Sequence, residues 1–136
     1  MDQIHKIEGK LTVHWVPEVR AIVDTWSNYF VTLAEFKEAV MGKGLEHARA
    51  YMGHAWIVDS STAKGAFPAE IQAFIESDCF PAFAKHGIKW FLTISSTSAI
   101  TNMSIGNYVS KLGPAGIKLV EASSVEGAVS WLKSNM

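Results

Sequence analysis

The sequence predicts a single α/β domain with a mixed, mostly parallel five-stranded sheet that starts with an antiparallel hairpin. Short apolar runs of strand length alternate with stretches of helical spacing, which is the pattern of right-handed β-α-β units. The chain has 136 residues, of which 49% are hydrophobic, so it fits one domain with a sizeable core. We therefore expect the order β-β-α-β-α-β-α-β-α within one domain over residues 1–136.

The hairpin is expected at the start of the chain. Leu11–Val16 alternates apolar and polar residues, as a half-buried strand does. Residues 21–27 carry β-branched and aromatic side chains that suit a second strand. Because only a short turn that begins with Pro17 separates the two strands, they should pair antiparallel.

The first helix is predicted from a capping box formed by Thr32 and Glu35. Apolar residues follow at helical spacing. We expect Gly42 and Gly44 to loosen or break this helix before a second piece over residues 45–52.

Three further strands are expected, each followed by a helical stretch. These strands are short, apolar and typical of strands covered on both faces. Pro68 suits the first turn of one helix, and Pro81 should kink or split it. Ser123 and Glu126 form a second capping box at the start of the last helix. The strands are predicted at residues 54–58, 89–94 and 117–120, and the third helix at residues 102–112.

Composition narrows the function classes. Twelve basic and thirteen acidic residues leave a formal charge of −1, and no basic cluster is present, so we expect no nucleic-acid partner. No window reaches the ~18 apolar residues of a membrane span and the start of the chain lacks a secretory signal, so we expect a cytoplasmic protein without a transmembrane segment. The five histidines lack metal-binding spacing and Cys79 is the single cysteine, so we expect no metal, cofactor or internal disulfide.

Several short segments, in their order along the chain, resemble the STAS superfamily of anti-sigma-factor antagonists. The resemblance is closest to its stand-alone cytoplasmic branch, which is often described together with the CRAL-TRIO lipid carriers. The resembling segments are Asp24-Thr-Trp-Ser27, Phe36 with Ala39, Trp56-Ile-Val-Asp59, Glu70-Ile-Gln72, Phe80-Pro81 and the stretch from Glu126 to Leu132. The resemblance implies a STAS-like fold and no settled activity for this branch.

In phospho-regulated STAS proteins a partner kinase modifies a serine in an Asp-Ser-Ser-Gly turn after the third strand. Asp59, Ser60 and Ser61 match the first three positions of that turn, and the glycine comes later, at Gly65. The resemblance therefore makes Ser60 and Ser61 the candidate phosphorylation sites.

Hydroxyl clusters follow the predicted strands, and ligands of open α/β sheets bind at the carboxyl ends of parallel strands. We therefore expect a ligand or partner surface there. An alternative is that these groups cap helices and satisfy loop amides. Asp59 also has a functional and a structural interpretation. Its carboxyl group could act as an acid or base, or it could accept hydrogen bonds from the amides of the following loop. The candidate residues at the strand ends are Asp59, Ser60, Ser61, Thr62, Lys64, Ser95 and Ser96.

Aromatic residues suggest a second surface where the second strand passes into the first helix. Trp26, Tyr29 and Phe30 would form an apolar patch for a partner or ligand if they are exposed. Together with Phe67 and Phe74 they would line a cleft between the sheet and its first two helices. Apolar residues on an edge strand would also support a homodimer.

The expected function is a non-enzymatic regulatory or protein-interaction module of STAS-like type, with a serine switch at the end of the third strand. The alternative is a binding or carrier protein for a small apolar, lipid-like ligand. The sequence has no nucleophile–base pair, phosphate loop or metal set, so an enzyme that uses Asp59 is the least favoured alternative.

Overall fold

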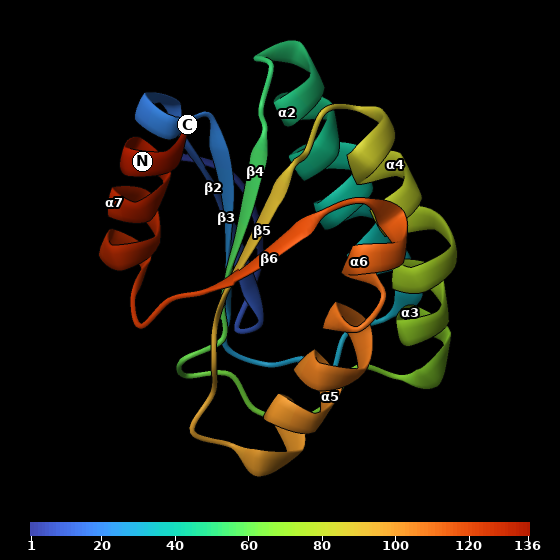
Figure 1. Cartoon of the computed structure of the whole chain (residues 1–136). Helices are drawn as coiled ribbons and strands as arrows, with labels where there is room; N and C mark the ends of the chain where they lie inside the picture. Colours follow the sequence, from blue (N-terminus) through green and yellow to red (C-terminus); the bar gives the residue numbers. More distant parts are fainter.

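A six-stranded mixed sheet runs through the computed structural model, which describes residues 1–136 (Figure 1). β1, β2 and β3 pair antiparallel, and β3, β4, β5 and β6 pair parallel. The α/β class, the antiparallel start and the parallel remainder are confirmed, whereas the predicted count of five strands is wrong. The strands lie side by side in sequence order: β1 (Asp2–Ile7), β2 (Leu11–Val16), β3 (Ala21–Trp26), β4 (Ala55–Asp59), β5 (Trp90–Ile94) and β6 (Lys118–Glu121).

The strand that the prediction missed is β1, at one edge of the sheet. Its sequence, DQIHKI, is mostly polar, and none of its residues is buried. It pairs with β2 alone, with an irregularity between Gln3 and His5. Backbone pairing along one side stabilises an edge strand, so its side chains need not form an apolar run. The short 3₁₀ turn η1 (Pro17–Val19) then joins β2 to β3.

The helical segment after β3 is continuous and has a π-helical middle. It comprises α1 (Leu33–Phe36), η2 (Lys37–Leu45) and α2 (Glu46–Ala50). Thr32 Oγ1 accepts from the Glu35 N–H at 3.1 Å, and Glu35 Oε1 accepts from the Thr32 N–H at 2.9 Å. The predicted capping box is therefore confirmed.

The two glycines do not break the helix, as one form of the prediction had it, and both lie within the wider π-helical turns of η2. A Cβ atom at Gly44 would lie 2.8 Å from Cη2 of Trp56, whereas Gly42 has ample space around it. Gly44 therefore lets the helix pack closely against β4, and close packing explains this glycine better than chain flexibility does.

The helical segment after β4 contains a second π-helical stretch. It comprises α3 (Ala69–Phe74), η3 (Ile75–Cys79) and α4 (Phe80–Lys85). Pro81 lies in the first turn of α4 and does not split the segment. Because proline lacks an N–H, the regular hydrogen-bond pattern is interrupted here, and the widened turn of η3 comes directly before it.

Three helices complete the chain. α5 (Ala99–Val109) and α6 (Leu112–Ala115) connect β5 to β6, and α7 (Val125–Asn135) follows β6. α5 begins earlier than predicted because Ser98 Oγ accepts from the Thr101 N–H at 3.3 Å. The cap of α7 is Ser124, which accepts from the Gly127 N–H at 3.0 Å, and the predicted second capping box does not form.

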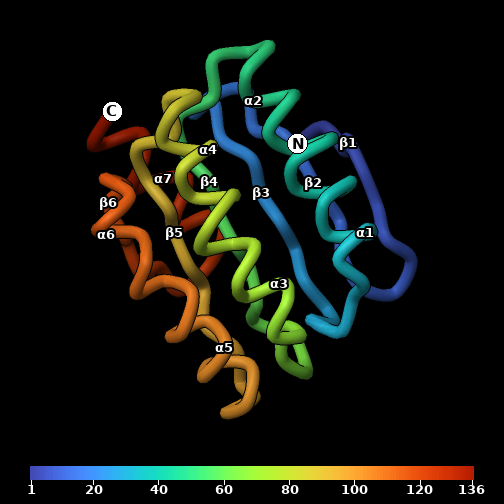
Figure 2. Tube along the Cα trace, turned by 90° about the vertical axis from the view of Figure 1, so that its right-hand side faces the viewer, coloured from blue at the N-terminus to red at the C-terminus, as the bar shows by residue number.

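The helices cover the two faces of the sheet unequally. α1 to α6 lie on one face and α7 lies on the other (Figure 1), and Figure 2 shows α1, α3 and α4 in front of the strands. The larger hydrophobic core lies under α1 to α6 and contains most of the buried aromatic side chains. A smaller core under α7 consists mainly of alanine, valine, leucine and isoleucine. We call the face of the sheet under α1 to α6 the aromatic face. It has the larger interior and is therefore the face where a site within the protein can form.

Candidate functional site

Ser60 lies inside the protein rather than on the predicted surface at the strand ends. It is 0% exposed, and its Oγ lies 2.5 Å from the hydroxyl oxygen of Tyr29. Its backbone N–H donates to the Ile94 carbonyl at 3.1 Å. A kinase cannot reach this hydroxyl in the folded protein, which contradicts the prediction of Ser60 as a phosphorylation site.

The neighbouring residues form a turn that uses Asp59 as an acceptor. Asp59 Oδ1 accepts from the Ser61 backbone N–H at 3.0 Å and from the Ser61 hydroxyl at 2.7 Å. Thr62 and Lys64 follow and are exposed, whereas Ser61 is half-buried. This geometry supports the alternative interpretation of Asp59, in which the carboxylate satisfies the groups of the following loop.

Ser96 joins the loops that follow β4 and β5. Its hydroxyl donates to the Ala63 carbonyl at 2.8 Å and accepts from the Ser98 N–H at 2.9 Å. Asn102 holds the backbone of Ser96 through bonds of 2.8 and 2.7 Å. The strand ends therefore come together as predicted, but the hydroxyl of Ser96 fastens loops and is not free for a ligand.

Ser95 is exposed and lies in an open groove at the carboxyl ends of β5 and β6. The groove has a volume of about 540 Å³ and also contains Asn102, Glu121 and Ser123. It lies where the chain leaves β5 toward one face of the sheet and leaves β6 toward the other, which is a topological switch point. Its polar lining residues are mostly exposed and include no cation.

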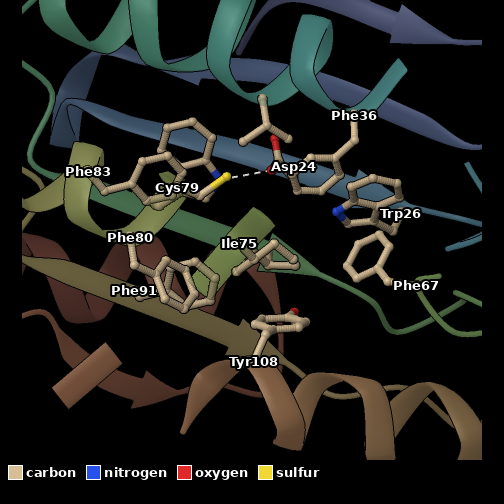
Figure 3. Close-up of a pocket in the computed structure, with 13 residues that line it drawn as sticks. Asp24, Trp26, Phe36, Phe67, Ile75, Cys79, Phe80, Phe83, Phe91 and Tyr108 are labelled. Carbon is tan, nitrogen blue, oxygen red and sulfur yellow. Dashed lines mark hydrogen bonds between the residues drawn. The ribbon is translucent and has the colours of Figure 1, made fainter. Parts of the chain in front are cut away.

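A small cavity lies between the sheet and the helices of the aromatic face (Figure 3). Its volume is about 30 Å³, enough for a water molecule or two. Twelve of its thirteen lining residues are hydrophobic, and the exception is Asp24 on β3. The lining residues are Asp24, Trp26, Phe36, Val40, Trp56, Val58, Phe67, Ile75, Cys79, Phe80, Phe83, Phe91 and Tyr108.

Asp24 is the one ionisable carboxyl group in this apolar environment. It is 2% exposed, and its Oδ2 accepts from Trp56 Nε1 at 2.8 Å. Its Oδ1 has no hydrogen-bond partner in the protein. Burial raises the pKa of Asp24 to about 7, and the hydrogen bond from Trp56 opposes this rise only in part. Both the neutral acid and the carboxylate are therefore accessible near neutral pH.

A chain of buried hydroxyls leads from the cavity to the end of β4. Tyr108 lines the cavity, and its hydroxyl lies 3.2 Å from that of Tyr29, which bonds to Ser60. Burial raises the pKa of Tyr29 to about 12 and that of Tyr108 as well, so both phenols stay neutral. Burial also raises the pKa of the Cys79 thiol, which removes its thiolate as a nucleophile.

The predicted aromatic surface divides between the cavity and the exterior. Trp26 and Phe67 line the cavity, as predicted for the cleft, but Tyr29 is 0% exposed and stacks on Phe67 with ring centroids 4.1 Å apart. Phe30 is 68% exposed, and Phe74 packs on the outside of the core. The expected exposed patch of Tyr29 and Phe30 together is therefore wrong, because Tyr29 points into the core.

Sequence reasoning missed Asp24 and Trp56 as site residues. The signal was present, because Asp24 interrupts the otherwise apolar first four positions of β3, and those positions are all buried. A carboxyl group in such a strand has to lie next to a hydrogen-bond donor or a cavity, since an unpaired buried carboxylate is strongly destabilising.

Neither a metal centre nor a membrane span is found in the structure. No group of three or more His, Cys, Asp or Glu side chains is placed to hold a metal ion. None of the helices has the length and apolar character that a membrane span requires. No protein-family model, curated protein or solved structure matches this chain, so its resemblance to STAS domains stays a prediction.

Proposed function

We propose that this chain is a non-enzymatic binding module that takes a small apolar, lipid-like ligand between the sheet and the helices of the aromatic face. The observation that carries the proposal is Asp24, a buried carboxyl group with one unpaired oxygen in a cavity lined otherwise by hydrophobic residues. Such a group lowers the stability of the ligand-free fold. Small-molecule sites typically combine apolar walls with a few placed polar groups.

Binding requires the cavity to widen, because about 30 Å³ is well below the ~300 Å³ at the low end for ligand sites. Three lining residues belong to the two π-helical stretches: Val40 lies in η2, and Ile75 and Cys79 lie in η3. π-Helical turns are rare and often occur at functional sites. A return of either stretch to α-helical hydrogen bonding would rotate these side chains relative to the sheet and change the space between them.

Native mass spectrometry of protein freshly purified from its own cells tests the proposal. The expected result is an added mass of a small organic molecule, which is lost on denaturation. The matched control is Cys79→Met, which puts a larger, flexible apolar side chain into the cavity and should abolish the added mass. No added mass on either protein, with no molecule in solvent extracts of the wild type, would contradict the proposal.

A second function rests on the exposed residues near the ends of β3 and β4. Phe30 is 68% exposed, and its neighbour Tyr29 donates its N–H to the Lys64 carbonyl at 2.9 Å, so Phe30 lies close to the loop that carries Thr62. We propose that this surface binds a protein partner in the manner of a STAS-like regulatory module. Ser61 is the remaining candidate for a phosphorylation switch, because it is half-buried rather than enclosed.

The switch is tested by incubating the protein with cell lysate and ATP and mapping phosphorylated residues by mass spectrometry. Phosphate is expected on Ser61 and absent from Ser60, and Ser61→Ala serves as the control. Absence of phosphate from both Ser61 and Thr62 would exclude this form of regulation. The binding of a small ligand and the binding of a protein partner are separate outcomes, since the cavity and this surface share no side chain.

A further inference from the structure

We propose that Asp24 recognises the polar end of the ligand, and that the ligand is a small, uncharged, largely aromatic molecule with one hydroxyl group that bonds to Asp24 Oδ1. This inference rests on the proposed function and adds the chemical class of the ligand. It follows from the way in which Asp24 is held, from the composition of the cavity wall and from the hydrogen-bonding capacity of each ligand class.

The carboxyl group of Asp24 is fixed in orientation by Trp56. The Trp56 Nε1–H donates to Oδ2 at 2.8 Å, which leaves Oδ1 as the free oxygen. The Trp56 ring is itself held, because it stacks on Phe83 at a centroid distance of 4.2 Å and packs against the backbone at Gly44. Figure 3 shows Asp24 between Cys79 and Phe36, as one of the side chains around the cavity. The cavity therefore presents Asp24 Oδ1 as an oriented, unpaired acceptor in a mostly apolar wall.

The wall excludes anionic ligands. None of its thirteen residues is a lysine, arginine or histidine, so a fatty-acid carboxylate or a phosphate would find no cation there. Such an anion would instead lie near the Asp24 carboxylate, and repulsion between like charges in a medium of low dielectric constant opposes this strongly.

A hydroxyl group fits Asp24 better than an amine does. Because burial raises the pKa of Asp24 to about 7, the group is present as acid and as carboxylate near neutral pH. A hydroxyl accepts from the acid and donates to the carboxylate, so it matches both forms. A primary ammonium has three N–H donors, and the wall offers it few acceptors apart from Asp24. Eight of the thirteen lining side chains are aromatic, which favours an aromatic body for the ligand.

The test uses ligand-observed fluorine NMR with two probes of nearly equal shape, para-fluorophenol and para-fluorotoluene, and with the anionic para-fluorobenzoate. Three proteins are used: the wild type, Trp56→Phe, and the double variant Asp24→Leu/Trp56→Phe. The double variant removes the carboxyl group together with the N–H that it satisfies, so no buried group is left unpaired and we expect the fold to be preserved. Trp56→Phe alone keeps Asp24, with Oδ2 freed as a second acceptor for the hydroxyl, and controls for the loss of the indole.

The readout is the dissociation constant of fluorotoluene divided by that of fluorophenol, measured for each protein. A substitution that makes the whole cavity more or less apolar changes both constants alike, so its effect cancels in this ratio. We expect this ratio to fall by about tenfold or more between Trp56→Phe and the double variant. We also expect fluorobenzoate to bind the wild type at least about tenfold more weakly than fluorophenol.

The outcomes separate this inference from the proposed function. If both neutral probes bind and the ratio changes less than about twofold, Asp24 does not recognise the hydroxyl, while the cavity still binds apolar molecules. If fluorobenzoate binds as tightly as fluorophenol, the assigned ligand class is wrong. If neither neutral probe binds the wild type, the inference and the proposed function both fail.

Discussion

Replacing Asp24 with asparagine keeps the shape of the side chain and an oxygen for Trp56 but removes its ionisation. In the folded protein Asp24 favours its neutral form, because burial raises its pKa from 3.8 to about 7. In the unfolded chain the same group ionises near its ordinary value. Between these two values the folded state therefore holds a proton that the unfolded state has released.

The sign and size of the effect follow from this difference. The contribution of Asp24 to the free energy of unfolding falls as the pH rises from about 4 to about 7 and is constant above that range. A difference of about three pKa units corresponds to about 4 kcal/mol, at about 1.4 kcal/mol per unit. Asp24→Asn has no such term, so it should resemble the wild type near pH 4 and be more stable by up to about 4 kcal/mol near pH 8.

Urea unfolding of the two proteins across this pH range measures the prediction. The other titrating groups are the same in both proteins, so they cancel when the two free energies of unfolding are subtracted. The difference should rise with pH and level off above the pKa of Asp24. A difference that does not change with pH would refute the argument, because Asp24 would then be either ionised in the folded state or exposed to solvent.

Two further substitutions test the packing around the site, and a third tests the cap of α1. Tyr29→Phe should cost about 1–3 kcal/mol of stability in urea unfolding, because the enclosed Ser60 hydroxyl loses its bond of 2.5 Å; no loss would mean that the hydroxyl has another partner. Gly44→Ala should cost about 1–3 kcal/mol and alter the near-ultraviolet circular dichroism of Trp56, since its Cβ would lie 2.8 Å from that ring; an unchanged spectrum would contradict this. Thr32→Ala should cost about 1 kcal/mol by loss of the capping box, and an unchanged urea midpoint would show that the cap contributes little.

The fold could be predicted where side chains carry the signal. The buried strands show continuous apolar runs, and the capping box shows two residues at a fixed spacing. β1 is stabilised by backbone pairing at an edge, so its polar residues gave no such signal. A glycine in a helical stretch is compatible both with a break in the helix and with close packing against a neighbour. At Gly44 the close approach of the Trp56 ring shows that the reason is packing, and this approach cannot be seen in the sequence.

The sequence predicted which strand ends meet, but it did not predict which side chains form the candidate site. Topology alone brings the ends of β4 and β5 together, which the alternation of strands and helices already implied. Whether a serine at such an end faces solvent depends on the residue opposite, and for Ser60 that residue is Tyr29, thirty-one positions away. The same holds for Asp24, whose partner Trp56 lies on the neighbouring strand. Pairings between distant side chains are not visible in local patterns.

The central claim is that the aromatic face receives a small molecule whose polar end lies at Asp24. A crystal structure of the protein purified directly from its cells, without added ligand, tests this most directly. We expect continuous electron density for an organic molecule among Trp26, Phe67 and Tyr108, with one polar atom within hydrogen-bond distance of Asp24 Oδ1. Close-packed aromatic side chains with at most a water molecule at that oxygen would contradict it.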